Sequence, residues 1–464
     1  MQKNFRESSL SGAASPSVPV ESRADLIEAI ASGSKPRSQW RVGTEHEKFT
    51  FHLADNSPAA YEGERGIRAL LDGYRRATGA TPVYDGNAVI GLREGDRSIS
   101  LEPGGQFELS GAPLANVHET AAEAAGHLAI AKRVAEPLGL GFLGIGAHPT
   151  LSVAETPVMP KSRYAIMKPY MEKVGSLGTS MMFRTCTIQA NLDFESEADM
   201  VRKFRVGLAL QPVATALFAN SPFIDGRPSG YLSFRSHVWL NTDAARTGML
   251  PFVFEDGMSF ERYVDFALDV PMYFVVRAGK FINTAGESFR AFLEGKLPQL
   301  PGEKPLISDW EDHLSTIFPE VRLKRFLEMR GADMGDLAAI PALAAFWTGI
   351  LYDEIALDAV HDIIRHWDAA ARLKMRVDVP KLGLRTPAPG RNIRYGTMHD
   401  IALDLVGIAE AGLLRRGITN ADGKDETIYL APLEETLKLG KTPAERLLEH
   451  CTEGAEGVFR TNRM

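Results

Sequence analysis

The segment from Trp40 to Phe51 constrains this chain more than any other, because it has the pattern of a β-strand that carries acidic groups. Glu45 and Glu47 are two residues apart, so both side chains leave the same face of that strand, and Phe49 continues this face. An apolar face is normally buried, and two carboxylates at its end repel each other and lose hydration unless a cation lies between them. For oxygen ligands alone the expected cation is Mg²⁺, which in such sites usually carries a nucleotide phosphate.

A second segment, Ser100–Ser110, also carries acids at strand spacing. Its Pro-Gly-Gly step must bend or bulge the strand, since neither residue type suits a regular strand interior. Because of this break, Glu102, Gln106 and Glu108 can face one cavity. The segment is therefore predicted to supply a second group of oxygen ligands.

Two later segments add amide, acidic and basic groups. Residues 181–194 alternate polar and apolar side chains, and Gln189 and Asn191 lie on the polar face. Residues 322–330, taken as one strand, place Glu328 and Arg330 on one face. An acid and an arginine two residues apart can hold a metal ion and a phosphate side by side.

Each of these signals also has a purely structural explanation. A single Glu-x-Glu pair is more often solvent-exposed than metal-bound, and Glu328 with Arg330 fits a structural ion pair. Gln189 and Asn191 fit hydrogen bonds across strands. A functional site is favoured because acids, amides and arginines recur on strands whose opposite faces are apolar.

The distribution of elements predicts an α+β fold: a mostly antiparallel sheet surrounded by helices, with a mostly helical C-terminal region from about residue 334. Residues 1–20 are predicted to be a disordered tail, and residues 21–464 to form a single catalytic domain. Further predicted strands are 89–93, 98–109, 142–147, 233–240 and 272–282. The predicted helices are 22–31, 65–77, 116–138, 164–174, 197–220, 337–351, 353–374, 396–416 and 442–450.

The charge balance, 52 Lys and Arg against 59 Asp and Glu, argues against a nucleic-acid-binding protein, which is usually basic. No apolar run is long enough to cross a bilayer, and the N-terminal residues lack the apolar core of a secretory signal. Cys186 and Cys451 are the only cysteines, which excludes a disulfide-built secreted fold and a cysteine-ligated metal site. We therefore expect a cytoplasmic protein without a membrane or nucleic-acid partner.

Several long motifs run along the chain. They are G-T-E-H-E-K-F (43–49), S-L-E-P-G-G-Q-F-E-L-S (100–110), F-R-T-C-T-I-Q-A-N-L-D-F (183–194), A-L-F-A-N-S-P-F (216–223), R-S-H-V-W (235–239), R-T-G-M-L-P-F-V-F (246–254) and R-L-K-R-F-L-E-M-R-G-A-D (322–333). These motifs closely resemble those of the plant-type glutamate–cysteine ligases, a group that also occurs in proteobacteria. The resemblance covers about residues 20 to 450, which is nearly the whole chain.

The resemblance implies a curved, mostly antiparallel sheet that forms a funnel, as in the catalytic domain of glutamine synthetase. It implies a ligase that uses ATP and Mg²⁺ to join the γ-carboxylate of L-glutamate to the amine of L-cysteine, the first step of glutathione synthesis. A monomer or homodimer is expected. The plant members carry further cysteines linked to redox control, so a thiol switch between Cys186 and Cys451 is a hypothesis for this chain.

The resemblance also assigns roles residue by residue. Arg330 corresponds to the contact of the γ-phosphate, and Arg235 to the arginine that holds the glutamate α-carboxylate. The implied Mg²⁺ ligands are Glu45, Glu47, Glu102, Glu108, Gln189 and Glu328. Asn191, Trp239 and Arg246 lie in matching motifs and are predicted to bind substrate.

Elementary chemistry agrees with this assignment. A carboxylate does not react with an amine near neutral pH, so ATP must first convert it to an acyl phosphate. Because ATP and glutamate are both anionic, metal ions and arginines are needed to bring them together. The chain has no G-x-x-x-x-G-K-[ST] motif, so the nucleotide must be held in another way. Two alternatives to a glutamate–cysteine ligase remain: a related ligase that uses a different amine, and an inactive binding protein on the same fold.

Overall fold

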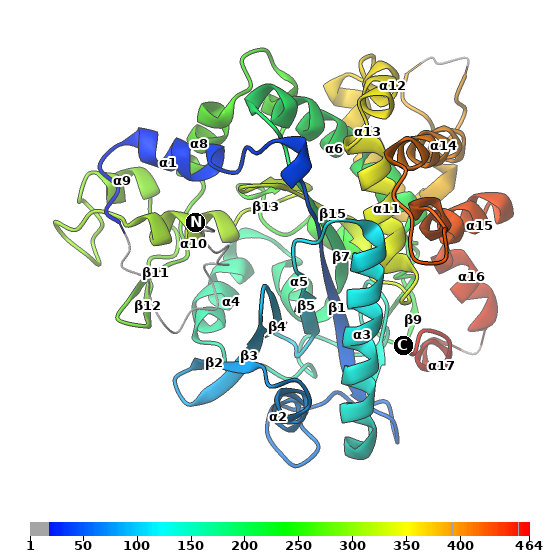
Figure 1. Ribbon diagram of the computed structural model, residues 1–464. Helices are drawn as coiled ribbons and strands as arrows, with labels where there is room; N and C mark the ends of the chain where they lie inside the picture. Colours follow the sequence, from blue (N-terminus) through cyan, green and yellow to red (C-terminus); the bar gives the residue numbers. More distant parts are fainter. Residues whose placement is uncertain (1–17, 391–393, 453) are drawn as a thin grey trace.

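The computed structural model describes residues 18–390, 394–452 and 454–464 (Figure 1). The strands of its main sheet are β1 Val42–His52, β2 Thr81–Asp85, β3 Ala88–Glu94, β4 Arg97–Leu101, β5 Phe107–Ser110, β6 Leu140–Leu143, β7 Thr187–Leu192, β14 Val321–Leu323 and β15 Leu327–Asp333. They follow the order β14-β15-β7-β1-β5-β4-β3-β2, with β6 paired to the second half of β1. The pairings in this sheet are antiparallel.

Three two-stranded ladders lie outside the main sheet. They join β8 Phe223–Ile224 to β9 Arg227–Pro228, β10 Thr247–Gly248 to β13 Phe318–Pro319, and β11 Phe274–Arg277 to β12 Lys280–Asn283.

Helices surround the sheet. They are α1 Arg23–Ala31, α2 Ile67–Thr78, α3 Val117–Ala135, α4 Ser162–Val174, α5 Gly178–Arg184, α6 Glu197–Leu217, α7 Phe234–Trp239, α8 Phe260–Asp269, α9 Phe289–Leu293, α10 Ile307–Ser315, α11 Ala339–Leu351, α12 Glu354–Ile364, α13 Ala369–Leu382, α14 Met398–Arg416, α15 Ala431–Leu439, α16 Pro443–His450 and α17 Val458–Thr461.

The two faces of the sheet have opposite characters. One face carries buried apolar residues such as Leu109, Ile188 and Ala190, and α3, α6 and α11 pack on the sheet. Figure 1 shows α3 and α11 running alongside β1. The other face carries Glu45, Glu47 and their polar neighbours. Because side chains alternate along a strand, burial of one face fixes which residues point to the other.

The predicted α+β architecture is confirmed, including the mostly helical region after about residue 334. The predicted break at Pro-Gly-Gly is also present: β4 ends at Leu101, β5 begins at Phe107, and Gly105 has φ +84°. Glycine adopts this left-handed conformation at little cost, which allows the tight turn between the two strands.

The prediction of a strand at 233–240 is wrong, because these residues form α7. Ser233 caps this helix by accepting a hydrogen bond from the Ser236 backbone N–H at 3.0 Å. A serine in the N-cap position favours the start of a helix, and its hydrogen bond stabilises this short turn.

Several other predicted elements have different limits. The segment 322–330 is not one strand but the hairpin of β14 and β15, and 272–282 is divided between β11 and β12. Residues 181–184 belong to α5, and only 187–192 form β7. The single helix predicted over 353–374 is divided between α12 and α13. Alternation and helical periodicity do not show where a short turn interrupts an element.

The predicted disordered tail lies outside the described residues for 1–17. For 18–20 the prediction is wrong: Val20 is 2% exposed, and its backbone N–H donates to the carbonyl of Pro305 at 2.9 Å. In the described part of the chain, no single helix is long and apolar enough to span a membrane. Helices α11 and α12 reach the required length and apolarity only when they are taken together, and the break between them is bent by 88°.

Candidate active site

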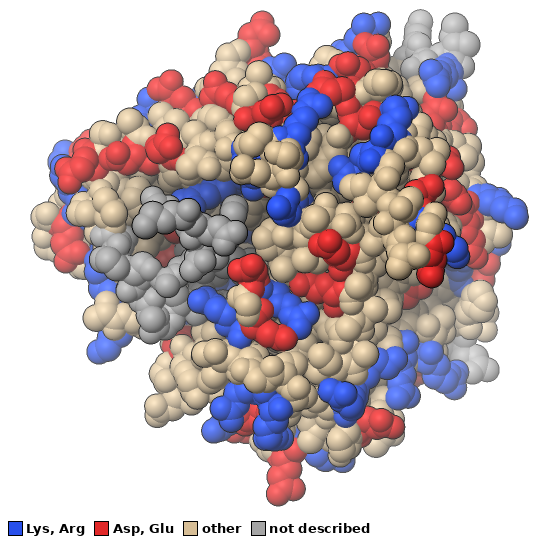
Figure 2. Space-filling view, in the orientation of Figure 1, with Lys and Arg blue, Asp and Glu red and all other residues tan. Residues whose placement is uncertain are grey.

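A cavity of about 650 Å³ opens over the polar face of the main sheet. Its walls come from β1, β4, β5, β7 and β15 and from the segments around α4, α5, α7 and α10. Nine of the predicted site residues line it: Glu45, Glu47, Glu102, Glu108, Gln189, Asn191, Arg235, Trp239 and Arg330. Figure 2 shows that basic and acidic side chains are interspersed over the side of the molecule seen in this view.

The register of the strands places the acids side by side. Glu47 lies directly opposite Glu108 on β5, and Glu45 lies directly opposite Gln189 on β7. Directly opposed residues share a face, with Cβ atoms about 4.5–5.5 Å apart. The cavity floor is therefore a row of oxygen-bearing side chains across three adjacent strands, with Asn191 donating to Glu45 at 3.0 Å.

These carboxyl groups are only partly compensated. Burial, followed by the charge of Glu102, raises the pKa of Glu47 to about 8. Burial and the neighbouring acids Glu102, Glu47 and Glu45 raise the pKa of Glu108 well above its ordinary value. Such shifts mean that the ionised forms would be favoured by an additional positive charge.

The carboxyl groups fit Mg²⁺ by their chemistry. All donors on the cavity floor are oxygen atoms of carboxylates or amides, which are the ligands that Mg²⁺ prefers. Within the described ranges, no three Asp, Glu, His or Cys side chains converge tightly enough to hold a metal ion as they stand. Metal binding would therefore require small movements of these side chains toward a shared cation.

Glu328 is placed differently from the other predicted metal ligands. It is 0% exposed and does not line the cavity. Its carboxylate accepts hydrogen bonds from Arg322 at 2.8 and 2.9 Å, lies 3.2 Å from Lys324 Nζ, and is paired with Arg330. Burial alone would raise the pKa of Glu328, but these three cations outweigh it and lower the pKa.

Arg330 connects this buried acid to the cavity. Its Nη1 contacts Glu328 and donates to Gln189 Oε1 at 2.6 Å. Its guanidinium lies 5.8 Å from the ring centres of both Trp239 and Phe318. Arg330 is therefore the link between the ion-pair cluster of β14–β15 and the row of oxygen ligands.

Helix α7 contributes the other predicted substrate residues. Arg235 and Trp239 both line the cavity, and Nη2 of Arg235 donates to the carbonyl of Arg330 at 2.9 Å. These residues are brought together although the sequence predicted a strand there, because four residues along a helix separate two side chains by about one turn.

The structure does not place Arg246 in the cavity. It is 0% exposed, and its nitrogens contact Asp243 at 2.6 Å and the carbonyls of Pro271 at 2.8 Å and Thr316 at 3.1 Å. It also lies 4.0 Å from the ring centre of Tyr273. Each of the three guanidinium nitrogens of Arg246 has a protein partner, so this side chain stabilises the surrounding loops, and it does not line the cavity.

Several basic residues that line the cavity were not predicted from the sequence, among them Lys161 and Arg163. Lys161 and Arg163 line the cavity at the start of α4, and Arg163 lies 3.8 Å from Glu102. Their segment has neither strand alternation nor a recognised motif. The only available signal was a pair of cations two residues apart before a predicted helix.

The hypothesis of a thiol switch gains no support. Cys186 and Cys451 are both free and buried, with 0% and 6% of their surfaces exposed. Cys186 lies in the hydrophobic core between α5 and β7, whereas Cys451 directly follows α16. A buried thiol in apolar surroundings is poorly reactive.

Comparison with known proteins identifies the family. The chain is 56% identical over 425 residues to the chloroplastic glutamate–cysteine ligase of Nicotiana tabacum, covering 92% of this chain and 79% of that protein. It is 54% identical over 427 residues to the chloroplastic glutamate–cysteine ligase of Arabidopsis thaliana, again covering 92% and 79%. A crystal structure of glutamate–cysteine ligase from Francisella tularensis in complex with AMP has a similar fold, with a TM-score of 0.53 at 12% identity, covering 91% of this chain and 87% of that one.

The expected cytoplasmic location is contradicted by these comparisons, because the similar plant proteins are named as chloroplastic. A low cysteine count indicates only a compartment in which folds are not built on disulfides. It does not separate the cytoplasm from the interior of an organelle.

The family model of glutamate-cysteine ligase family 2 matches residues 41–461, so the chain belongs to this family.

Proposed function

We propose that this chain joins the γ-carboxylate of L-glutamate to the amine of L-cysteine with consumption of ATP, the first step of glutathione biosynthesis, and that the cavity over β1 is its active site. Family membership along residues 41–461 supports the reaction. The location of the active site is supported by the row of incompletely compensated carboxyl groups on the cavity floor, next to Arg330 and Arg235.

The acids would hold Mg²⁺. The proposed ligands are Glu45, Glu47, Glu102, Glu108 and Gln189. When bound, Mg²⁺ would neutralise the phosphate charge of ATP and so allow the nucleotide to approach another anion. Glu328 remains a predicted ligand, but its carboxylate would first have to lose part of its pairing with Arg330 and Lys324.

The arginines have separate roles in this proposal. Arg330 would bind the transferred phosphoryl group, since a planar guanidinium offers two parallel donors to phosphate oxygens. Arg235 would bind the α-carboxylate of glutamate and so direct its γ-carboxylate toward ATP. Attack of the γ-carboxylate on the γ-phosphorus of ATP would then give an acyl phosphate and ADP.

The amine of cysteine would complete the reaction. Its nitrogen would attack the acyl carbon, the C–N bond would form, and inorganic phosphate would leave with the C–O electron pair. The amine would lose one proton to solvent or phosphate and keep one as the amide N–H. Holding both substrates in one cavity makes this attack effectively intramolecular.

The proposed reaction is tested by ATP turnover with L-glutamate and Mg²⁺ in the presence of L-cysteine or a panel of other amines. We expect ADP formation that depends on cysteine and a product with the mass of γ-glutamylcysteine. Turnover that prefers another amine would make the protein a sister ligase with the same activation step. A folded protein without turnover on any amine would favour the inactive-binder alternative.

The raised pKa of Glu47 gives a prediction for metal binding. An acid whose pKa rises from its ordinary 4.5 to about 8 on folding destabilises the metal-free protein increasingly as the pH rises across that interval. A cation beside the carboxyl groups removes this cost. We therefore expect Mg²⁺ to raise Tm more at pH 8 than at pH 6, measured by thermal unfolding with Mg²⁺ or with EDTA.

The matched control is Glu47→Gln, which removes the charge but keeps the shape. In this variant the difference between the Mg²⁺-induced shifts at pH 8 and pH 6 should become smaller. An equal shift of Tm at both pH values in the unmodified protein would contradict the proposed metal site.

A further inference from the structure

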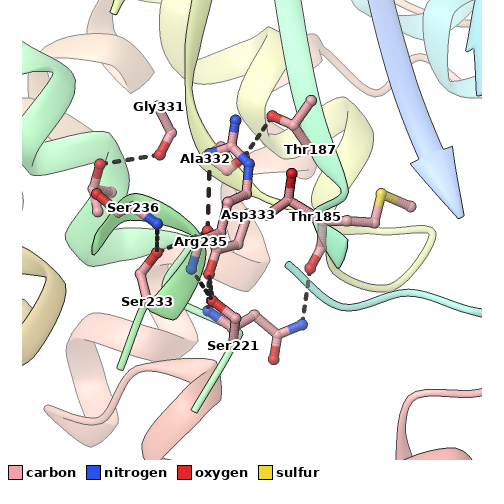
Figure 3. A network of polar contacts seen from close by, with 12 residues as sticks. Thr185, Thr187, Ser221, Ser233, Arg235, Ser236, Gly331, Ala332 and Asp333 are labelled. Carbon is pink, nitrogen blue, oxygen red and sulfur yellow. Dashed lines mark hydrogen bonds and ion pairs between the residues drawn. The ribbon is translucent and has the colours of Figure 1, made fainter. Parts of the chain in front are cut away.

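Asp333, the last residue of β15, is almost fully buried, with 1% of its surface exposed, and lies among residues of the α7 region (Figure 3). Its Oδ2 accepts hydrogen bonds from Ser221 Oγ at 2.6 Å and from the Asn220 backbone N–H at 2.9 Å. Its Oδ1 accepts a hydrogen bond from Ser233 Oγ at 2.8 Å and lies 3.9 Å from Arg235 Nη1. This carboxylate is therefore a buried structural anion with both oxygens engaged.

The two serine hydroxyls extend this network to the first turn of α7. Ser233 Oγ accepts from the Ser236 backbone N–H at 3.0 Å, and Ser221 Oγ accepts from the Arg235 backbone N–H at 3.2 Å. Because each hydroxyl donates its proton to Asp333, its lone pairs are directed toward these backbone N–H groups. Figure 3 shows the contacts converging between Ser221, Ser233 and Asp333. Asp333 thus fixes the start of α7 at two points.

The guanidinium of Arg235 is held by the same region. Nη2 donates to the carbonyl of Arg330 at 2.9 Å, and Nη1 faces Asp333. Arg235 is 3% exposed, and burial lowers its pKa, while Asp333 is the carboxylate that most strongly opposes this effect. A buried guanidinium at a cavity wall needs such a counter-charge to keep its position.

A β-bulge in β15 places Asp333 where it can act as the counter-charge of Arg235. The register between β15 and β7 shifts by one residue between Met329 and Ala332, so that Asp333 rather than Ala332 stands opposite Thr187. Without the shift, the regular alternation would put an alanine at this position. The bulge therefore brings an acid to the end of the strand that also carries Arg330.

We propose that Asp333 is a positioning residue for glutamate binding: through Ser221, Ser233 and the ion pair, it holds Arg235 at the angle needed to meet the α-carboxylate. The inference rests on the proposed role of Arg235. Helix α7 has only six residues and has little stability of its own, so it depends on these anchors. Loss of one anchor should move the guanidinium without unfolding the protein.

The test is Asp333→Asn, which keeps the size of the side chain and one acceptor oxygen but removes the charge. We expect KM for glutamate to rise on the order of tenfold, because misplacement of a binding group by a fraction of an ångström is costly. KM for ATP should change by less than about twofold, since ATP does not use this arginine. Ser233→Ala should change KM for glutamate in the same direction by a smaller factor.

Ser259→Ala is the matched control. Ser259 caps α8 by accepting a hydrogen bond from the Arg262 backbone N–H at 3.1 Å, and it does not line the cavity. Its replacement removes an equivalent helix cap, and the KM values for all three substrates should stay unchanged.

The possible outcomes separate this inference from the assignment of Arg235. If Arg235→Gln leaves KM for glutamate unchanged, the assignment of Arg235 fails. If Arg235→Gln raises that KM but Asp333→Asn does not, only the positioning role of Asp333 is overturned. If Asp333→Asn does not fold, Ser221→Ala and Ser233→Ala decide: an unchanged KM for glutamate in both variants overturns the inference.

Discussion

Replacement of Glu328 by glutamine is expected to abolish measurable turnover and to lower the free energy of unfolding by about 3–5 kcal/mol, the range for removal of one partner from a buried ion pair. The carboxylate is 0% exposed and balances Arg322, Lys324 and Arg330. Without its charge, Arg322 stays buried and uncompensated, and Arg330 loses the group that orients it toward the cavity. Urea unfolding and a turnover assay measure the two effects.

The pH dependence of the stability loss provides an internal check. The pKa of Glu328 is lowered on folding, so its contribution is fully present above the ordinary value of 4.5 and is lost as the pH falls below that value. The difference in stability between the unmodified protein and Glu328→Gln should therefore be constant from pH 6 to pH 8 and shrink in acid. A difference that grows in acid would contradict the ion-pair arrangement.

The control for Glu328→Gln is Glu303→Gln. Glu303 pairs with Arg277 at 3.1 Å, but half of its side chain is exposed. Exposed ion pairs contribute about 0–1 kcal/mol, so this variant should unfold almost as the unmodified protein does. Near-normal kcat in Glu328→Gln, with normal activity in the control, would remove Glu328 from the active site.

Replacement of Arg330 by lysine is the second change with a large expected effect: a fall in kcat of about 10²–10³-fold, the range for loss of one transition-state donor. Lysine keeps the positive charge but cannot offer two parallel donors to phosphate oxygens. The measurement is steady-state ATP turnover with saturating glutamate and cysteine.

Arg290→Lys is the control for Arg330→Lys. Arg290 pairs with Asp269 through two nitrogens, at 2.7 and 3.1 Å, but its side chain is partly exposed and does not line the cavity. This variant should keep normal kcat. If Arg330→Lys also kept normal kcat, phosphate binding would have to be assigned to another cation of the cavity, such as Lys161 or Arg163.

Local patterns were sufficient for much of the fold and for part of the site. Alternation on β1 indicated that Glu45 and Glu47 share a face, and the Pro-Gly-Gly step indicated a break before Glu108. Burial of the apolar faces of both strands then places Glu47 and Glu108 on the same face of the sheet, where the observed register sets them opposite each other. These features depend on residues close in sequence or on a single buried face, so periodicity reveals them.

Other features depended on contacts between distant segments. The segment around Arg235, for which a strand was predicted, folds as α7. Ser233 caps this helix, and Asp333, one hundred residues away, accepts a hydrogen bond from Ser233. Arg246 lies in a matching motif, yet it donates to the carbonyls of Pro271 and Thr316 and does not line the cavity.

The sequence by itself determined the family, the antiparallel α+β architecture and the acidic row on β1, because alternation and motif spacing are properties of residues that are close together in the sequence. Only the tertiary structure decided that Glu328 is enclosed by three cations, that Lys161 and Arg163 join the cavity, and that a bulge brings Asp333 to Arg235. The burial of a charged group and the presence of its counter-charge depend on which side chains, distant in sequence, lie close together in space. Local sequence patterns do not reveal these spatial distances.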